Sequence, residues 1–466
     1  MDIRYVHDTN GVQYHLARPL GRGGQGAVYQ VSQGRLAVKL LFERSARRRE
    51  HLKNQLAHVR LLPLDGLPIA RPTVSLREPN VGYVMELLTG MEPLQRLIWP
   101  GRGNVVDAAW YNAGGGLRRR LILLAKTADA LAQLHARGLI FTDISPSNVF
   151  VSKNADQTEV CLIDADNLVY HSSQGANPIY TPRYGAPEVV AGTSGPTSLS
   201  DAFAFAVTAF QVLTLAHPLL GDAVMGGEFE QEEKALAGAF PWVDHPIDRS
   251  NASSSGFPRS IVLSPGLCKV FEEMFNEGLL QREARPGMGA LAESLHLAAE
   301  PTVTCPACRG TYYLKAGQCP WDGAPPPPMI VGYFELWEPE RRDIDEAGQI
   351  DKKVKDPHDI SKNLILLCSV VTELQSLIIT RWHKDGCTQR EAQTPQIELK
   401  LDGKRLLIRS LDGATYALAM PGGDVAVVDD KPRDLQPAAG KSYHLHLGPP
   451  DKLHRVLRLI SRGGRS

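Results

Sequence analysis

The chain has 466 residues, 43% hydrophobic and 22% charged, and 51 basic residues balance 51 acidic ones to a formal net charge of zero. This composition is typical of a soluble globular protein, and a neutral chain predicts neither nucleic acid nor a membrane surface as a partner. No apolar run approaches the roughly 20 residues that a membrane helix needs. The N-terminus also lacks the apolar stretch of a signal peptide, so we expect a cytoplasmic protein of more than one domain.

Residues 1–87 are expected to form a small lobe of twisted strands with one helix. Its first motif contains four closely spaced glycines, Gly21, Gly23, Gly24 and Gly26. Residues typical of a strand follow directly, where a dinucleotide-binding fold would place a helix. A glycine loop between two strands can fold over nucleotide phosphates, because no Cβ keeps the backbone away. An ordinary glycine-rich hairpin is the alternative.

Lys39 stands at the end of the apolar run Leu36-Ala37-Val38, which predicts a strand. From this position a lysine can point inward and meet the α- and β-phosphates of a nucleotide. The alternative is a lysine whose side chain reaches past the strand end to water. The glycine loop just upstream favours the inward orientation.

Residues 88–300 are expected to form a larger, helix-rich lobe. Apolar residues at helical spacing predict a long helix over 117–137, and a nearly wholly apolar stretch predicts a buried helix over 200–216. Between them, Asp143 is followed five positions on by Asn148, and a predicted strand ends in Asp164. An aspartate can accept the proton of an attacking hydroxyl, and amide and carboxylate oxygens suit Mg²⁺. A loop cap or a solvated turn is the alternative for each acid.

In this order and local context, Lys39, Asp143, Asn148 and Asp164 make residues 12–300 resemble the eukaryotic-type (Hanks-type) bacterial Ser/Thr protein kinases. The resemblance implies an α+β, bilobal protein kinase fold that uses ATP and Mg²⁺. It also implies transfer of the ATP γ-phosphoryl group to Ser or Thr of the kinase itself or of a protein partner. The alternatives are a pseudokinase scaffold, which binds nucleotide and partner proteins without catalysis, and a small-molecule kinase.

The resemblance also implies individual roles. Asp143 would orient the acceptor hydroxyl, Asn148 and Asp164 would hold Mg²⁺, and Thr181 would contact Asp143, which favours a Ser or Thr acceptor over Tyr. The residues implied to bind the nucleotide are Gly21, Gly23, Gly24, Gly26, Val28, Ala37, Lys39, Met85, Glu86 and Leu88.

The segment that closes the activation loop is also similar to that of the family. Thr181 to Glu188 resembles the family's T-x-x-Y-x-A-P-E, and Asp201 resembles the structural aspartate that opens the apolar helix. Arg285 resembles the late arginine that pairs with the glutamate of Ala-Pro-Glu, here Glu188. These positions favour a protein substrate over a small molecule.

Two positions beside Asp143 depart from the family's pattern. The residue before it is Thr142 in place of arginine, which predicts activity that needs no phosphate on the activation loop, where Ser172 and Ser173 lie. The residue two positions after it is Ser145 in place of lysine, as in the similar loops of RIO-type kinases.

Two further departures concern Lys39 and Asp164. The family's D-F-G is Asp164-Ala165-Asp166 in this chain, so control by a packed phenylalanine is not expected. The glutamate that pairs with Lys39 should come from a helix over 45–62. We predict Glu50 for this role, with Glu43 as the alternative.

Residues 301–329 contain three of the seven cysteines, and a run of prolines closes the segment. Cys305 and Cys308, followed by Cys319 and Asp322, resemble the two knuckles of a zinc ribbon. A Cys₃Asp site for structural Zn²⁺ is the prediction, and a ribbon that has lost its metal is the alternative.

Residues 330–466 predict a β-rich, sandwich-like domain whose short β-type runs are separated by turn pairs such as Asp402-Gly403. The runs cover 397–401, 405–410, 415–419, 425–428 and 443–447. We find no catalytic motif there, and partner binding is the expectation. The catalytic loop and the trailing cysteines weakly resemble kinases of bacterial stress-response (tellurite-resistance-like) clusters, whose partners are von Willebrand A-type proteins and PP2C-type phosphatases.

Overall fold

The structure is a computed structural model that describes residues 4–23, 26–101, 105–170, 180–338, 365–386 and 392–462. Gly24, Ser172 and Ser173 therefore lie outside the described residues. The chain divides into two compact units. The first comprises Met1–Trp110, Arg119–Arg259 and Pro265–Leu295, and the second comprises Tyr111–Arg118, Ser260–Ser264 and His296–Ser466. In the described ranges, no helix is both long enough and apolar enough to cross a membrane.

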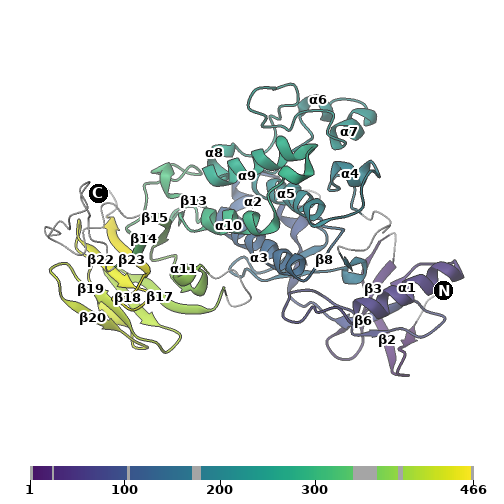
Figure 1. Ribbon diagram of the computed structural model, residues 1–466, viewed down its shortest axis with the longest axis horizontal. Coiled ribbons are helices and arrows are strands. Elements are labelled where there is room, and N and C mark those ends of the chain that lie inside the picture. Colours follow the sequence, from purple (N-terminus) through teal and green to yellow (C-terminus); the bar gives the residue numbers. More distant parts are fainter. Residues whose placement is uncertain are drawn as a thin grey trace, which may run out of the picture. The chain divides into compact units, whose positions relative to one another are not determined.

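The first unit begins with a six-stranded antiparallel sheet in the order β1-β2-β3-β4-β6-β5, with helix α1 lying along it (Figure 1). The elements are β1 (Tyr5–His7), β2 (Gln13–Arg22), β3 (Gly26–Val31), β4 (Leu36–Leu41), α1 (Ala46–Val59), β5 (Val74–Ser75) and β6 (Gly82–Glu86). Branched side chains such as Val31, Val38 and Val84 form its core. Ser45 caps α1 by accepting a hydrogen bond from the amide of Arg48, which defines where the helix begins.

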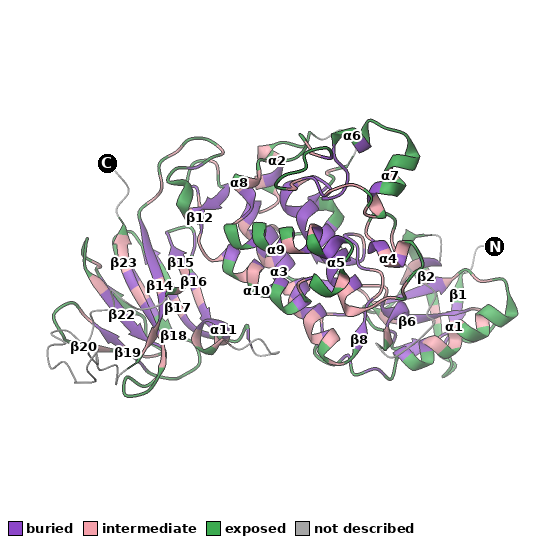
Figure 2. Cartoon of the chain, turned by 45° about the horizontal axis from the view of Figure 1, so that its top comes forward, coloured by how far each residue is buried: buried purple, intermediate pink, exposed green. Residues whose placement is uncertain are grey.

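The remainder of the first unit is mainly helical. The predicted helices over 117–137 and 200–216 are confirmed as α3 (Gly116–Ala136) and α5 (Ser198–Thr214), and nearly every residue of α5 is buried (Figure 2). The other helices are α2 (Ala108–Ala113), α4 (Pro187–Val190), α6 (Asp222–Met225), α7 (Phe229–Leu236), α8 (Arg259–Val262), α9 (Pro265–Phe275) and α10 (Met288–Ala299). Two small sheets, β7-β9-β10 and β8-β11, carry the loops of the candidate site.

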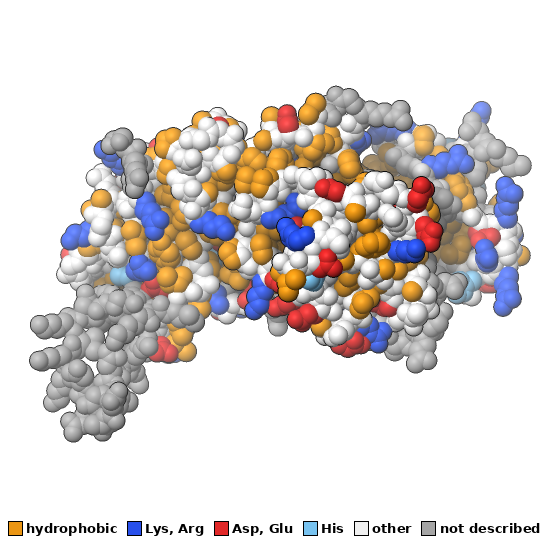
Figure 3. Space-filling model, turned by 90° about the horizontal axis from the view of Figure 1, so that it is seen from above, with side chains coloured by type: hydrophobic (Ala, Val, Ile, Leu, Met, Phe, Trp, Pro, Cys, Tyr) orange, Lys and Arg blue, Asp and Glu red, His pale blue; other side chains and the backbone are white. Residues whose placement is uncertain are grey.

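The strands of these small sheets are short. They are β7 (Met91–Pro93), β8 (Leu139–Ile140), β9 (Val149–Ser152), β10 (Val160–Leu162) and β11 (Val169–Tyr170). A strand-rich lobe followed by a helix-rich lobe is the arrangement that the bilobal resemblance implied. On the face shown in Figure 3, acidic and basic side chains are interspersed, as expected of a chain without net charge.

The second unit is β-rich. A short hairpin of β12 (Thr302–Thr304) and β13 (Thr311–Tyr313) precedes a six-stranded sheet in the order β15-β14-β23-β22-β19-β20 and a four-stranded sheet in the order β16-β17-β18-β21. Their strands are β14 (Met329–Trp337), β15 (Ile365–Val371), β16 (Leu377–Thr380), β17 (Pro395–Asp402), β18 (Arg405–Ser410), β19 (Tyr416–Ala419), β20 (Val425–Val428), β21 (Arg433–Leu435), β22 (Ser442–His446) and β23 (His454–Arg462). One apolar core contains residues of both sheets, for example Phe334 and Ile397.

The cysteine-bearing segment does not form a separate body. Its buried residues Val303 and Tyr312 share an apolar cluster with Met329, Val331 and Val370 of β14 and β15. The division into 301–329 and 330–466 remains a prediction, but the structure places both in one compact unit, together with residues 111–118 and 260–264.

Candidate functional site

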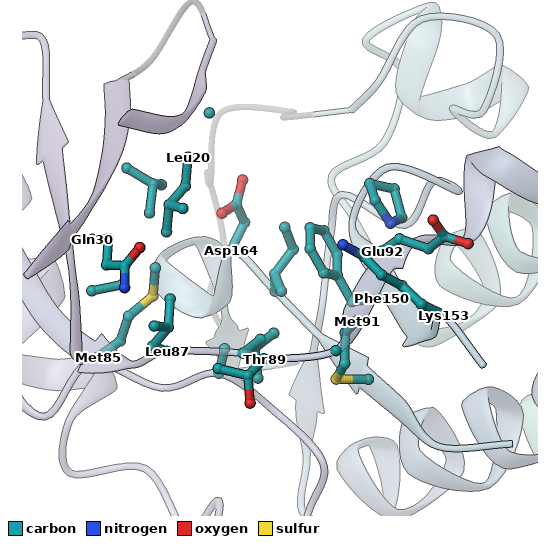
Figure 4. Close-up of a pocket in the computed structure, with 18 of the residues that line it drawn as sticks. Leu20, Gln30, Met85, Leu87, Thr89, Met91, Glu92, Phe150, Lys153 and Asp164 are labelled. Atoms are coloured by element: carbon teal, nitrogen blue, oxygen red, sulfur yellow. The ribbon is translucent and has the colours of Figure 1, made fainter. Parts of the chain in front are cut away.

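A cavity of about 1250 Å³ opens in the first unit and is lined by residues of β2, β3, β4 and β6, by the segment from Leu87 to Gly101, and by Phe150 and Asp164. Figure 4 shows Leu20, Gln30 and Met85 on one side, with Phe150 on the other side. Seven residues predicted from the sequence line it: Gly21, Val28, Ala37, Met85, Glu86, Leu88 and Asp164. The cavity therefore combines apolar walls with a few polar groups, as ligand sites do.

The glycine loop connects β2 and β3, and its glycines differ in their surroundings. A Cβ on Gly26 would lie 2.3 Å from the carbonyl oxygen of Leu40, so only glycine lets β3 approach β4 there. A Cβ on Gly21 or Gly23 would meet nothing within 4 Å. The amide of Gly23 donates to the carbonyl of Gly26 at 2.9 Å, which closes the turn. Gly21 and Gly23 thus leave open space beside the loop, where a phosphate can approach the backbone.

The segment after β6 presents a backbone acceptor at the cavity. The amide of Leu87 donates to the carbonyl of Arg35 at 2.9 Å. Because the peptide bond is trans, the carbonyl of Glu86 points the opposite way, away from that strand. Glu86 and Leu88, two of the residues expected to bind the nucleotide, both line the cavity.

Asp143 is held from two sides by side chains far apart in the sequence. The hydroxyl of Thr181 donates to one carboxylate oxygen at 2.7 Å, and the amide of Asn148 donates to the other at 3.0 Å. The same amide also donates to the carbonyl of Asp143 at 2.9 Å. These three residues were predicted to share the site, and the structure brings them together.

Asp201, at the start of α5, anchors the loop that carries Asp143. Its carboxylate accepts hydrogen bonds from the amides of Phe141 at 2.7 Å and Thr142 at 3.0 Å, and lies 2.9 Å from Nε2 of His135. Thr142 has a φ of 72°, a conformation that few residues other than glycine adopt. The buried carboxylate bonds two consecutive backbone amides at this turn and so stabilises it.

Asn148 and Asp164 lie at the same end of two paired strands. Val149 of β9 pairs with Leu162 of β10, and the amide of Ile163 donates to the carbonyl of Asn148 at 2.9 Å. Because Nδ2 of Asn148 is bonded to Asp143, its Oδ1 remains to bind a cation. An amide oxygen beside a carboxylate is a donor set that fits Mg²⁺. Burial raises the pKa of Asp164, an effect that the nearby charge of Lys39 opposes.

Lys39 is buried in β4 and bonds two carboxylates of the segment after β10. Its Nζ lies 2.9 Å from both carboxylate oxygens of Asp166 and 3.1 Å from Asp164. The hydroxyl of Tyr83, a fully buried residue of β6, donates to Asp166 at 3.3 Å. Burial lowers the pKa of Lys39, but the two carboxylates outweigh that effect and raise it. Lys39 is therefore positively charged, and the carboxylates of Asp164 and Asp166 balance its charge.

The prediction that Glu50 pairs with Lys39 is wrong. Its side chain is 66% exposed and lies 3.7 Å from Lys53, while the alternative Glu43 lies 3.9 Å from Arg48. The residue of α1 that reaches the site is Gln55, whose Nε2 donates to the backbone carbonyl of Asp166 at 2.6 Å. Gln55 stands five positions after Glu50, and five steps of about 100° place them about 140° apart around a helix.

Asp166 is the site residue that sequence reasoning missed. It stands where the resembled family has glycine. A second acid two positions after Asp164, at the end of a buried strand, was the signal that could have identified it.

The closing segment and the late arginine form the expected ion pair. Arg285 donates two parallel hydrogen bonds to Glu188, at 2.7 and 2.8 Å, and its Nε donates to the carbonyl of Gly278 at 2.6 Å. The guanidinium is fully buried, and bidentate pairs of this kind are among the stronger charged contacts in proteins. The pair connects α4 to the segment that precedes α10.

In the second unit, Cys305, Cys308, Cys319 and Asp322 each offer a ligand atom within 4.8 Å of the others. The sulfurs of Cys308 and Cys319 are 3.6 Å apart, and the sulfur of Cys305 is 3.5 Å from Asp322. The edge of a tetrahedron with metal–sulfur bonds of about 2.3 Å is about 3.8 Å. The four predicted residues thus lie close enough together to hold one metal ion, and thiolate and carboxylate groups are donors that Zn²⁺ accepts.

Comparison with known proteins supports the resemblance of the first unit to protein kinases. A family model described as protein kinase domain matches residues 14–282, more than half of the chain. Among curated relatives, the serine/threonine-protein kinase Pkn2 of Myxococcus xanthus is 32% identical over 225 residues, which are 45% of this chain and 25% of the relative.

Two further relatives are similar over a comparable share of this chain. The serine/threonine-protein kinase Pkn1 of Myxococcus xanthus is 31% identical over 43% of this chain, and the DNA damage-responsive serine/threonine-protein kinase RqkA of Deinococcus radiodurans is 30% identical over 45% of it. The matched regions are 29% and 31% of those relatives. The chain thus spans a third or less of the length of these proteins.

Proposed function

This chain belongs to the protein kinase family, and from that premise we propose that it transfers the γ-phosphoryl group of ATP to a Ser or Thr hydroxyl of a protein, itself included. The observation that carries the proposal is the arrangement around Asp143. Thr181 and Asn148 bond its two carboxylate oxygens, close to the end of the strand that carries Asp164. The names of the relatives support Ser and Thr as acceptors.

In the proposed reaction, the acceptor oxygen attacks the γ-phosphorus and its proton passes to the carboxylate of Asp143. The bond from the γ-phosphorus to the β–γ bridging oxygen breaks, and its electron pair leaves with ADP. Lys39 holds the α- and β-phosphates, and the backbone of Gly21 and Gly23 covers them. Asn148 and Asp164 would hold Mg²⁺, which when bound would supply positive charge for the phosphate oxygens.

A nucleotide-binding scaffold without catalysis is the second candidate. Ser145, which replaces the family's lysine, is fully buried, and its hydroxyl lies 2.8 Å from that of Ser147. It supplies no positive charge for the transferring phosphoryl group. This substitution favours the scaffold, whereas Lys39, Asp143, Asn148 and Asp164 favour the enzyme.

The wider biology is proposed on resemblance alone. A role in bacterial stress signalling, with von Willebrand A-type and PP2C-type partners in the cytoplasm, is supported by the catalytic loop and the trailing cysteines. One relative is named DNA damage-responsive, which fits such a role. Activity without a phosphate on Ser172 or Ser173 is part of the same proposal.

The decisive experiment is incorporation of labelled γ-phosphate from Mg²⁺-ATP, with wild-type protein beside Asp143→Asn and the exposed control Asp156→Asn. We expect label in the wild type and the control only, with unchanged thermal stability in all three, because the change at Asp143 is nearly isosteric. Transfer by Asp143→Asn would contradict the mechanism. No transfer by any protein, with nucleotide binding intact, would favour the scaffold.

We also propose that Cys305, Cys308, Cys319 and Asp322 bind one structural Zn²⁺. Tight turns hold both pairs: the amide of Gly310 donates to the sulfur of Cys308 at 3.4 Å, and the amide of Ala324 donates to Asp322 at 2.9 Å. Burial raises the pKa of Cys319, so in the metal-free state this thiol keeps its proton at neutral pH. Binding of the metal would release that proton.

Metal analysis of the purified chain tests this proposal. We expect one zinc per chain, lost in Cys319→Ser and retained in Cys268→Ser, a control at an exposed cysteine. Chelation should lower the thermal stability of the wild type and leave that of Cys319→Ser unchanged. Wild-type protein that contains no zinc after equilibration with the metal would refute the site.

A further inference from the structure

The carboxylate that neutralises Lys39 comes from an unusual place in the chain. Both oxygens of Asp166 lie 2.9 Å from Nζ of Lys39, and both residues are buried, with 5% and 7% of their side chains exposed. Tyr83 donates a further hydrogen bond to the same carboxylate. Burying a charged lysine without a partner is strongly unfavourable, so this pairing determines whether the lysine can be charged there.

Helix α1 does not provide this charge. Its residue at the site, Gln55, is neutral and binds the backbone carbonyl of Asp166, while the acids Glu43 and Glu50 lie beside Arg48 and Lys53. The neutral residue on the helix and the acid after the strand thus complement each other. A carboxylate at both places would crowd three acids, with Asp164, around one ammonium group.

We propose that Asp166 is the positioning residue for Lys39, in the role that a glutamate on the helix would otherwise have. The proposal rests on the kinase function proposed above, because it concerns the lysine of that site. Asp164 directly precedes one short 3₁₀ turn, Ala165–Asn167, and Asp166 lies within it; the turn begins after the positive φ of Asp164. One turn therefore places both the cation ligand and the partner of Lys39.

This arrangement has a consequence for regulation. In kinases whose lysine pairs with a helix glutamate, movement of the helix breaks the pair and switches the enzyme off. In this chain, movement of α1 would remove the hydrogen bond from Gln55 but would not break the pair of Lys39 and Asp166, because neither residue lies on that helix. Instead, the conformation of the turn from Asp164 to Asp166 would determine the position of the Lys39 side chain.

The proposal is tested in the whole 466-residue chain by moving the negative charge from residue 166 to residue 55. Four proteins are compared with wild type for kcat, for KM with Mg²⁺-ATP and for thermal unfolding: Asp166→Asn, Gln55→Glu, the double variant, and Glu50→Gln as an exposed control on the same helix. Asp166→Asn should lower kcat/KM on the order of 10²-fold, as removal of one preorganised electrostatic contact does. The double variant should regain at least about tenfold of that loss, and Glu50→Gln should equal wild type.

A merely structural role would not produce rescue by a charge placed on another element. If Asp166→Asn does not fold, recovery of folded protein that binds nucleotide in the double variant supports the proposal, and failure to recover overturns it. Asp166→Asn with kcat/KM within twofold of wild type also overturns it.

Failure of the kinase function itself would be visible separately. If the wild type transfers no phosphate, the affinity for Mg²⁺-ATP and the thermal midpoint are compared for Lys39→Met, Asp166→Asn and both together. Effects that are far from additive show that the pair exists without transfer, whereas additive effects overturn the pairing.

Discussion

Two residues of the site, Thr142 and Asp164, have positive φ angles of 72° and 62°. Such conformations are costly for residues other than glycine and persist only where the surroundings impose them. Asp201 bonds the backbone at Thr142, and Lys39 bonds the side chain of Asp164. The residues that hold these turns therefore contribute to the candidate site, although Asp201 would not touch the reacting atoms.

His217 gives a prediction at the residue scale. Its Nε2 donates to the carbonyl of Arg183 at 2.9 Å, and its Nδ1 accepts from the amide of Leu219 at 3.1 Å, so the neutral ring satisfies both bonds. Burial lowers the pKa of His217 to about 4. Below the unfolded value of about 6.5, the unfolded chain binds a proton that the folded chain does not. Stability is therefore lost as the pH falls from about 6.5 towards 4.

Because of His217, we expect the free energy of unfolding of the wild type to fall by about 2 kcal/mol when the pH is lowered from 7.5 to 5. Urea unfolding at the two pH values should show that loss in the wild type and in His51→Gln, a control at an exposed histidine. His217→Gln should lack it. Equal pH dependence in all three proteins would contradict the assignment.

At the scale of elements, local sequence predicted what lies within one strand, helix or loop. Apolar spacing located α3 and α5, and turn pairs separated the strands β17 to β20 close to the runs expected for them. The helical face of α1 was not predictable in the same way. Leu56 and Val59 mark its buried stripe, but which neighbouring residue meets Lys39 depends on how the helix packs on the sheet. The choice of Glu50 failed for that reason.

The β3–β4 pairing gives a prediction at this scale. Gly26→Ala would place a methyl group 2.3 Å from a backbone oxygen of β4, whereas Gly21→Ala meets nothing within 4 Å. We expect Gly26→Ala to lower the free energy of unfolding by about 1–3 kcal/mol, the usual cost of overpacking, because the strands must move apart. Gly21→Ala should stay within about 0.5 kcal/mol of wild type. Chemical denaturation of the three proteins measures both, and equal losses would show that close strand approach is not the cause.

At the scale of the whole molecule, the units do not follow the linear order of the chain. Residues 111–118 belong to the compact unit that contains residues 296–466. The amide of Arg118 donates to the hydroxyl of Thr311 at 2.9 Å, and its guanidinium donates to Thr302 at 3.0 Å. The ring of the buried Tyr111 lies 5.7 Å from that of Trp321. The helix α3, which begins at Gly116, continues from this segment into the site-bearing unit.

A chain that ends at residue 300 would lose Thr302, Thr311 and Trp321 and leave the start of α3 without them. We expect it to be less soluble than the full chain and to unfold at a lower temperature in the transition that Mg²⁺-ATP shifts. Trp321→Ala in the full chain should lower the same midpoint by a smaller amount. A chain ending at residue 300 with the midpoint of the full protein would show that the family region is stable by itself.

The sequence by itself determined which side chains could form the site, because each motif is a short span whose chemistry depends on spacing. The glycine loop, the Asp143-to-Asn148 loop and the acid that ends a strand are such spans. The tertiary structure decided the rest. The partner of Lys39 is 127 residues away in the sequence, and the cysteine segment shares its core with β14 and β15. Contacts between distant segments depend on packing that no local pattern encodes, so only the folded chain could assign Asp166 to Lys39.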